Sequence, residues 1–343
     1  MGRLAGIQHL RALAAVGVVI FHATGRIGEA WNVGAHGVDL FFVISGFLMI
    51  TISSRRPAPL RFLRDRLSRI VPAYWLATTV MVIGGTAHFF PRMTLTPPHV
   101  LGSYLFVPVR APSGDIVPLL VQGWTLDLEV AFYVLFAGLL LLKSPARVMA
   151  AMTIIMLGAC ALIGVAPAGS DVYTFYANPM ILEFALGGWL GVACMSRDNR
   201  LKAAGGVLLL AVGLLGLWLA GSQQVVRVAG IGTAAAAMLG GVIAIERRGM
   251  LPRLRLLRHL GDASYSIYLW HTLALSIVIG VARHLGSGYE ITLIASIVGA
   301  VAAGVCAHHL IDRPMIDLIE RLRRQPGSRE FTPIFRDSGQ PAG

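Results

Sequence analysis

Charged residues are scarce in this chain of 343 residues: 13% of it is Asp, Glu, Lys or Arg, whereas 56% is hydrophobic. A soluble domain carries roughly 25% charged residues, so the deficit argues against a soluble globule and excludes a disordered protein. The 39 glycines follow no three-residue repeat, which excludes collagen. Such a glycine content instead suits membrane helices, whose backbones approach closely at small residues.

Cysteine and the common ligand motifs are also lacking. The three cysteines, Cys160, Cys194 and Cys306, each lie in an apolar run, a pattern that fits neither a disulfide framework nor a metal site. The sequence contains no HExxH motif and no Cys/His cluster, so we expect no metal. It contains no P-loop and no GxGxxG motif, which argues against an ATP-driven pump.

Long apolar runs make up most of the sequence. About 20 largely apolar residues span a bilayer, and ten runs qualify: 7–24, 36–53, 70–90, 124–142, 147–166, 178–195, 203–220, 225–245, 263–283 and 290–311. An apolar piece at 100–109 is flanked by prolines and predicts a loop or re-entrant segment. The sequence therefore predicts an all-α polytopic membrane bundle of about ten transmembrane helices over 1–325, followed by a disordered cytoplasmic tail at 326–343.

The distribution of positive charge predicts the orientation. The formal net charge is +12. With the N-terminus inside, 24 of the 29 Lys and Arg residues fall in cytoplasmic segments and 5 fall outside. This bias predicts that both termini are cytoplasmic. It also accounts for most of the basic balance, so we expect no nucleic-acid partner.

Ionisable residues inside spans are costly and mark candidate functional sites. Arg11 and His22 are eleven residues apart on the first span, so they share one helix face, with His22 near the outer surface. Asp39 lies one turn into the second span and is expected to meet His22 and raise its basicity. Glu129, in the fourth span, is expected to complete this outer cluster. A plainer alternative for Arg11 is a cation that snorkels to the cytoplasmic surface.

Arginines also gather before the third span. Arg66 and Arg69 are spaced i, i+3 and would project from one helix face. They could contact anionic lipids or bind phosphate, for which the guanidinium fork is suited. Tyr74 lies at interface depth, where aromatic residues anchor helices. His271 lies within the ninth span, at a depth where a histidine does not face lipid.

Five sequence blocks follow one another in order over 8–271, nearly the whole chain: QHLRALAAVGVVIFH, HGVDLFFVISGFLM, RLSRIVPAYW, WTLDLEVAFY and SYSIYLWH. Together these blocks resemble the membrane acyltransferase-3 family, whose members move acyl groups, often acetyl, onto extracytoplasmic sugars. The resemblance to its exopolysaccharide-modifying O-acetyltransferases is strongest in the first two blocks. Two departures stand out: Asp312 replaces the glutamate of the family's Glu-x-Pro element, and no extracytoplasmic hydrolase-like domain follows.

The resemblance, taken with the buried charges, implies a set of site residues. The set comprises His22, Arg11, Asp39 and Glu129 as catalytic residues, Arg66, Arg69 and Tyr74 for acyl-CoA, and Trp124, Tyr133, Tyr265 and His271 lining the acceptor path. No cofactor is expected to stay bound, and acyl-CoA, specifically acetyl-CoA, is the implied co-substrate. His22 could act as general base on a sugar hydroxyl or be acylated first. Arg11 is a candidate oxyanion donor.

The resemblance further implies a multi-pass protein of the bacterial inner membrane. Its expected partners are the lipid bilayer, a polysaccharide or lipid-linked oligosaccharide acceptor, and polysaccharide-assembly proteins. Without the hydrolase-like domain, we expect it to act alone or with a separate partner. Two rival hypotheses stay open: a transporter or flippase for lipid-linked saccharides, and a structural subunit of an export complex. The absence of a visible internal repeat disfavours the transporter.

Overall fold

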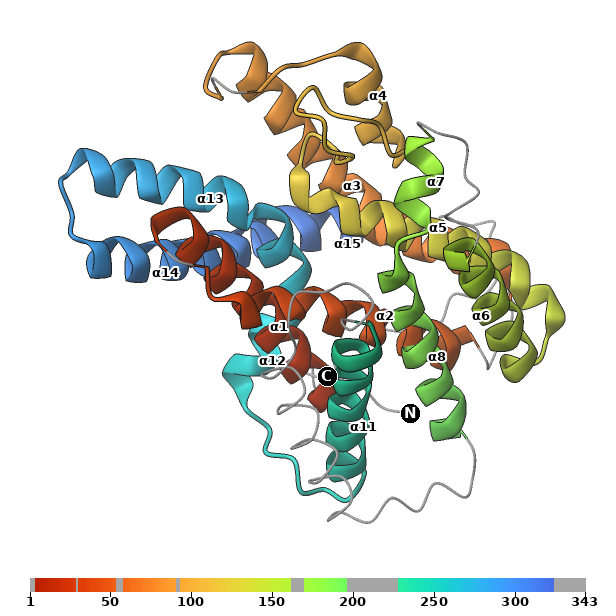
Figure 1. Cartoon of the computed structure of the whole chain (residues 1–343). Coiled ribbons are helices and arrows are strands. Elements are labelled where there is room, and N and C mark those ends of the chain that lie inside the picture. The colour runs from red at the N-terminus through yellow and green to blue at the C-terminus, as the bar shows by residue number, and fades with distance from the viewer. Residues whose placement is uncertain are drawn as a thin grey trace.

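The apolar runs fold as helices throughout the part of the chain that the computed structural model describes, namely 4–28, 30–53, 58–90, 93–161, 170–195 and 228–323 (Figure 1). The α-helices are α1 Ala5–Ile27, α2 Gly37–Ser53, α3 Pro59–Thr86, α4 Pro97–Leu105, α5 Trp124–Leu139, α6 Pro145–Ala161, α7 Asp171–Tyr176, α8 Leu182–Met195, α11 Thr233–Arg247, α12 Arg255–Asp262, α13 Ser264–His284, α14 Tyr289–Ala307 and α15 Arg313–Arg323. The 3-10 turns are η1 Asn32–His36, η2 Val121–Gly123, η3 Leu140–Leu142 and η5 Pro179–Ile181, and the π-turns are η6 Val228–Gly232 and η7 His308–Asp312. The β-structure in these ranges is one isolated bridge, between Arg110 and Ile116.

Nine of the ten predicted spans fall on described helices. Seven helical segments are long and apolar enough to cross a membrane: Ala5–Ile27, Asn32–Ser53, Pro59–Thr86, Val121–Leu142, Gly230–Arg247, Ser264–His284 and Tyr289–Arg323. Two shorter apolar helices, Pro145–Ala161 and Pro179–Met195, match two further predicted spans. The predicted span at 203–220 and the tail at 326–343 lie outside the described residues. The protein is therefore an all-helical, polytopic membrane bundle, as predicted.

Two predicted segments contain more helix than the apolar runs indicated. The third span was expected to begin at 70, after a cytoplasmic loop, but α3 begins at Pro59 because a proline is well suited to the first helical turn. Arg66 and Arg69, which were predicted to share a helix face, therefore stand on α3 itself, a helix of 28 residues. Similarly, the piece predicted as loop or re-entrant structure near 100–109 contains a short helix, α4, which again starts on prolines.

Glycine brings α2 and α8 into backbone contact, as the glycine content predicted. A Cβ on Gly46 would lie 2.0 Å from the carbonyl oxygen of Phe184, and one on Gly187 would lie 1.9 Å from the carbonyl oxygen of Val43. Both distances are far below van der Waals contact. Any side chain at Gly46 or Gly187 would therefore separate the two helices.

Helix α1 is surrounded by other elements, which positions its polar residues. It packs against η1, α2, α11, α12, α13 and α14. Glu246, at the end of α11, accepts hydrogen bonds from the backbone N–H groups of Ala5 and Gly6 at 2.6 and 2.9 Å. These bonds satisfy two of the free donors at the start of α1. Helices α13 and α14 form an antiparallel pair that projects beyond α1 (Figure 1).

Candidate active site

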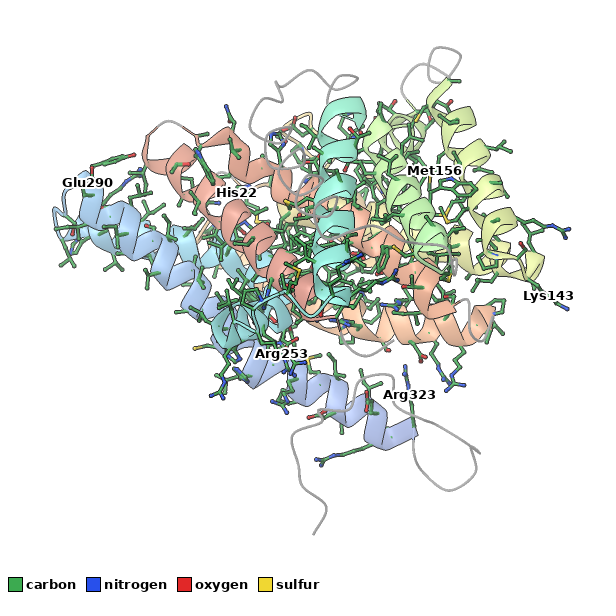
Figure 2. All side chains as sticks on the ribbon, turned by 90° about the horizontal axis from the view of Figure 1, so that it is seen from below. His22, Lys143, Met156, Arg253, Glu290 and Arg323 are labelled. Carbon is green, nitrogen blue, oxygen red and sulfur yellow. The ribbon has the colours of Figure 1, made fainter. Side chains whose placement is uncertain are left out.

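His22 on α1 faces His271 on α13. The Nδ1 atom of His22 lies 3.4 Å from the Nε2 atom of His271, and the ring centroids are 4.9 Å apart. His271 is completely buried, whereas His22 is partly exposed. Figure 2 shows His22 toward the end of the molecule that carries Glu290, away from Lys143. The structure thus joins histidines of the first and ninth predicted spans.

The hydrogen bonds of this pair fix where the protons lie. The Nδ1 atom of His22 is 2.9 Å from the carbonyl oxygen of Val18, and the Nδ1 atom of His271 is 2.6 Å from that of Tyr268. Because a carbonyl oxygen only accepts, each Nδ1 carries the proton of its neutral ring. His271 Nε2 is then a second acceptor for the Nδ1–H of His22. The Nε2 lone pair of His22 has no partner among the described residues, so it is free to act as a base.

His22 opens onto a cavity of about 430 Å³, a volume typical of small-molecule sites. Its polar lining comprises His22, Arg26, Gln122, Trp124, Tyr268, Thr272 and Ser276, and the remaining wall is mostly aliphatic and aromatic. Of the residues predicted to line the acceptor path, Trp124 lines this cavity. His271 lies behind His22, and Tyr133 and Tyr265 lie elsewhere.

Gln122 is a site residue that sequence reasoning missed. Its side-chain amide donates to the Leu269 carbonyl oxygen at 2.6 Å and accepts from the Thr272 hydroxyl at 3.0 Å. The Tyr268 hydroxyl donates to the Gln122 backbone carbonyl at 3.0 Å. Together these bonds tie the start of α5 to the turn of α13 that carries His271. A single glutamine before an apolar run belongs to no motif. The only feature of the sequence that could have indicated Gln122 is a polar residue close to Trp124.

Asp39 does not meet His22 in the described contacts. Its carboxylate is completely buried and lies 3.5 Å from Nδ1 of His36. Helical structure begins at Asn32 through the η1 turn, so Asp39 lies deeper than one turn into the span. A Cβ on Gly37 would lie 2.3 Å from the Ala14 carbonyl oxygen, which places the start of α2 below the level of His22. The side-chain partner of His22 is therefore the imidazole of His271 and not the carboxylate of Asp39, as was expected.

Glu129 lies with Arg11 rather than with His22, contrary to the predicted outer cluster. Its carboxylate accepts from the Ser45 hydroxyl at 2.9 Å and from the Tyr133 hydroxyl. The guanidinium of Arg11 is within electrostatic range of Glu129. The span begins at Val121 through a 3-10 turn, so Glu129 lies roughly 12 Å below the start of the span.

Arg11 is held inside the bundle rather than extended to its surface. Its Nε donates to the Ser264 hydroxyl at 3.0 Å, and its guanidinium lies 6.0 Å from the centre of the Phe41 ring. It stands eleven residues from His22 on one helix, which is roughly 16 Å. An oxyanion donor must lie about 3 Å from the developing charge. Arg11 is therefore too far from His22 for the oxyanion role.

Arg66 and Arg69 approach the same polar group from α3. Both are partly exposed and within electrostatic range of Tyr133, and Arg69 is also within range of Arg11. Arg66 stacks over the Phe62 ring at 5.7 Å. We call Arg11, Arg66 and Arg69 the arginine cluster. Its carboxylate neighbours are Glu129 and Asp262 near Arg11 and Asp312 near Arg69.

Two tyrosines predicted at these sites take different positions. Tyr74 is completely buried, with its ring centroid 4.7 Å from that of Phe106. Because α3 starts early, Tyr74 falls mid-helix, and it lies neither at the lipid interface nor on the arginine cluster. The hydroxyl of Tyr265 donates to the carbonyl oxygen of Ile70 at 2.8 Å. Tyr265 therefore fastens α13 to α3 beside the cluster instead of lining the cavity.

Asp312 is a second residue to which the sequence assigned no role. It ends the π-turn η7, a distortion that often marks functional sites. The carboxylate is buried and accepts from the Ser266 hydroxyl, and it lies within electrostatic range of Arg69. Within the described ranges, no group of three or more His, Cys, Asp or Glu side chains is arranged to hold a metal.

Most of the chain matches one protein family. The family profile described as "Acyltransferase domain" matches residues 4–309. This chain belongs to the acyltransferase-3 family. It is 41% identical over 308 residues to the exopolysaccharide production protein ExoZ of Rhizobium meliloti, covering 87% of this chain and 94% of ExoZ.

Other relatives of this acyltransferase-3 protein are more distant. Nodulation protein 10 of Rhizobium leguminosarum bv. viciae is 27% identical over 90% of this chain and 92% of its own length. The putative peptidoglycan O-acetyltransferase YrhL of Bacillus subtilis is 25% identical over 95% of this chain, which spans 56% of YrhL. No solved structure matches the chain. The protein is thus a multi-pass membrane acyltransferase related to ExoZ and to O-acetyltransferases.

Proposed function

We propose that this protein moves an acetyl group from cytoplasmic acetyl-CoA to a hydroxyl of an extracytoplasmic or lipid-linked polysaccharide. The observation that carries the proposal is the free Nε2 of His22 at a cavity of about 430 Å³. The names of ExoZ and of the O-acetyltransferases point to the same chemistry and to an exopolysaccharide acceptor. The proposed location is the bacterial inner membrane, because a cytoplasmic donor would be available there and polysaccharide-assembly proteins would supply the acceptor.

The arginine cluster supports the donor end of this proposal. Coenzyme A is polyanionic at its nucleotide end, and guanidinium forks bind phosphate bidentately. Arg66 forms no ion pair with a carboxylate in the described part of the chain, so its charge is available to a ligand. The acyl end of the donor must then rise roughly 16 Å, the axial separation of Arg11 and His22.

The proposed reaction uses His22 as a general base. Its Nε2 removes the proton of the sugar hydroxyl while the hydroxyl oxygen attacks the thioester carbonyl carbon. The carbon–sulfur bond then breaks, and the imidazolium returns the proton to the thiolate, which gives the ester and free coenzyme A. His271 Nε2 stabilises the imidazolium by accepting its Nδ1–H. The indole N–H of Trp124 has no partner among the described residues and is the proposed oxyanion donor.

The function is tested by comparing cells with and without the protein. We expect NMR of the surface polysaccharide to lose its O-acetyl signals without the protein and to regain them on complementation. Purified protein in vesicles should also move labelled acetyl from acetyl-CoA to the saccharide. If the missing protein blocks polysaccharide export while acetyl content per sugar is unchanged, and no thioester is cleaved, the transporter or the structural subunit is favoured instead.

Arg66 and Arg69 are expected to govern donor affinity. Replacing both with alanine should raise the KM for acetyl-CoA by about tenfold or more, with a smaller effect on kcat, because ground-state phosphate binding is lost. Lysine should restore only part of the affinity, since the fork is gone. Arg64→Ala is the matched control, because Arg64 lies on the same helix and is exposed beside Asp65. An unchanged KM in the double variant would assign the pair to lipid contact.

A further inference from the structure

Two outer arginines lie together near the ends of α1 and α13, and one of them, Arg26, lines the His22 cavity. Only five of the 29 Lys and Arg residues are assigned outside by the charge bias, and Arg26 and Arg283 are two of them. The Arg283 guanidinium donates to the backbone carbonyl oxygen of Arg26 at 3.4 Å. Arg26 itself lines the cavity and stands four residues beyond His22 on α1, which is roughly 6 Å along the helix axis.

The guanidinium of Arg26 is held in place by α13. Its Nη1 donates to the Thr272 carbonyl oxygen and to the Ser276 hydroxyl, both at 2.9 Å. Its Nη2 and Nε atoms have no acceptor in the described residues. The side chain is therefore anchored along one edge, while its remaining donors are available to a ligand.

No carboxylate in the described part of the chain forms an ion pair with Arg26 or Arg283. Arg110, the other described outer arginine, differs because it pairs with Asp171. An anchored, unneutralised guanidinium at the mouth of a cavity is an anion site, since its fork matches carboxylate or phosphate oxygens. The second positive charge, from Arg283, strengthens the field at the rim.

We propose that the acceptor is anionic and that its carboxylate or phosphate binds Arg26 while a nearby hydroxyl lies at His22 Nε2. This inference rests on the proposed function and specifies its acceptor. The anion belongs either to an acidic sugar or to the phosphate that links a saccharide to its lipid carrier. A carboxylate and a phosphate each present a pair of oxygen atoms that one edge of the Arg26 guanidinium can bind. In either case the reacting hydroxyl lies about one helical turn from the anion.

The test uses purified protein in phosphatidylcholine vesicles with three acceptors: a neutral gluco-oligosaccharide, the same chain with one glucose oxidised to glucuronate, and the neutral chain linked through pyrophosphate to a polyprenol. We expect kcat/KM to be higher by about tenfold or more for at least one anionic acceptor than for the neutral one. Arg26→Gln should remove this preference and Arg26→Lys should keep part of it. The preference should also weaken as salt is raised. Arg110→Gln removes an outer charge away from the cavity and should preserve the preference.

The outcomes separate the sources of the anion. A preference for the glucuronate chain alone identifies a sugar carboxylate, and one for the pyrophosphate lipid alone identifies the carrier phosphate; both support the proposal. Equal use of neutral and anionic acceptors by the wild-type protein overturns it. So does an equal loss toward all acceptors in Arg26→Gln, which would make Arg26 a structural or lipid-headgroup contact. Failure of the proposed function looks different, because the wild-type protein would then acetylate none of the three.

Discussion

Replacing His22 with alanine should abolish acetyl transfer. A positioned general base contributes about a hundredfold to ten-thousandfold, and the free Nε2 of His22 is the described basic nitrogen that opens onto the cavity. Labelled transfer to saccharide, measured in vesicles with equal amounts of protein, gives the rate. His284→Ala is the matched control, because His284 is an exposed histidine at the end of α13 and should leave the rate unchanged. Near wild-type activity in His22→Ala would disprove the proposed centre.

The same assay distinguishes a base held by His271 from one that acts alone. His271→Gln keeps an oxygen that can accept the Nδ1–H of His22, whereas His271→Leu cannot accept it. We therefore expect the glutamine variant to retain a larger kcat than the leucine variant, with little change in either KM. Equal losses in both variants would reduce His271 to a packing residue.

Donor and acceptor should reach the protein from opposite sides of the membrane. The charge bias places the start of α3 inside, and His22 lies roughly 26 Å along α1 from Ala5, where the helix begins, toward the other face. In Figure 2, His22 lies on the side of the molecule that carries Glu290, away from Lys143 and Arg323, which the charge bias assigns to the cytoplasm. In sealed vesicles of known orientation, transfer should occur only with acetyl-CoA on the side of the arginine cluster and saccharide on the opposite side.

Reversed placement should give no product, because neither substrate crosses a bilayer unaided. A detergent-permeabilised sample of the same vesicles is the control and should be active with any placement. If both substrates react from the side of the arginine cluster alone, the enzyme acts at its cytoplasmic face. In that case His22 would lie too far away to be the base, although the family assignment would stand.

The helical pattern of the sequence predicted the fold because hydrophobic length alone selects spans. The same pattern placed Arg11 and His22 on one face of one helix and predicted the roles of Gly residues in close packing. It failed where a helix began earlier than the apolar run suggested. The helical segments of the second and fourth spans begin earlier, with 3-10 turns at Asn32 and Val121. Asp39 and Glu129 therefore lie deeper in the bundle than predicted and are separated from His22.

The partner of His22 could not be predicted, since depth in the membrane is encoded locally but the direction in which a residue faces is not. His271 had been placed at a suitable depth, yet nothing in its own helix indicates that it turns toward α1. That contact depends on how α13 is held, through Gln122 to the η2 turn before α5 and through Arg26 to α1. Both links join residues that are far apart in the sequence and belong to no motif.

The glycine contact between α2 and α8 limits how the bundle can move. Gly46 and Gly187 each rest on a carbonyl oxygen of the other helix, and Gly46 is flanked on α2 by the larger residues Ser45 and Phe47. A slide of α2 by one residue along this contact would bring a Cβ into space that the backbone of α8 already fills. Helices α2 and α8 must therefore travel as one rigid body. Any rearrangement that admits a bulky saccharide has to occur at other helix boundaries, where side chains rather than main chains meet.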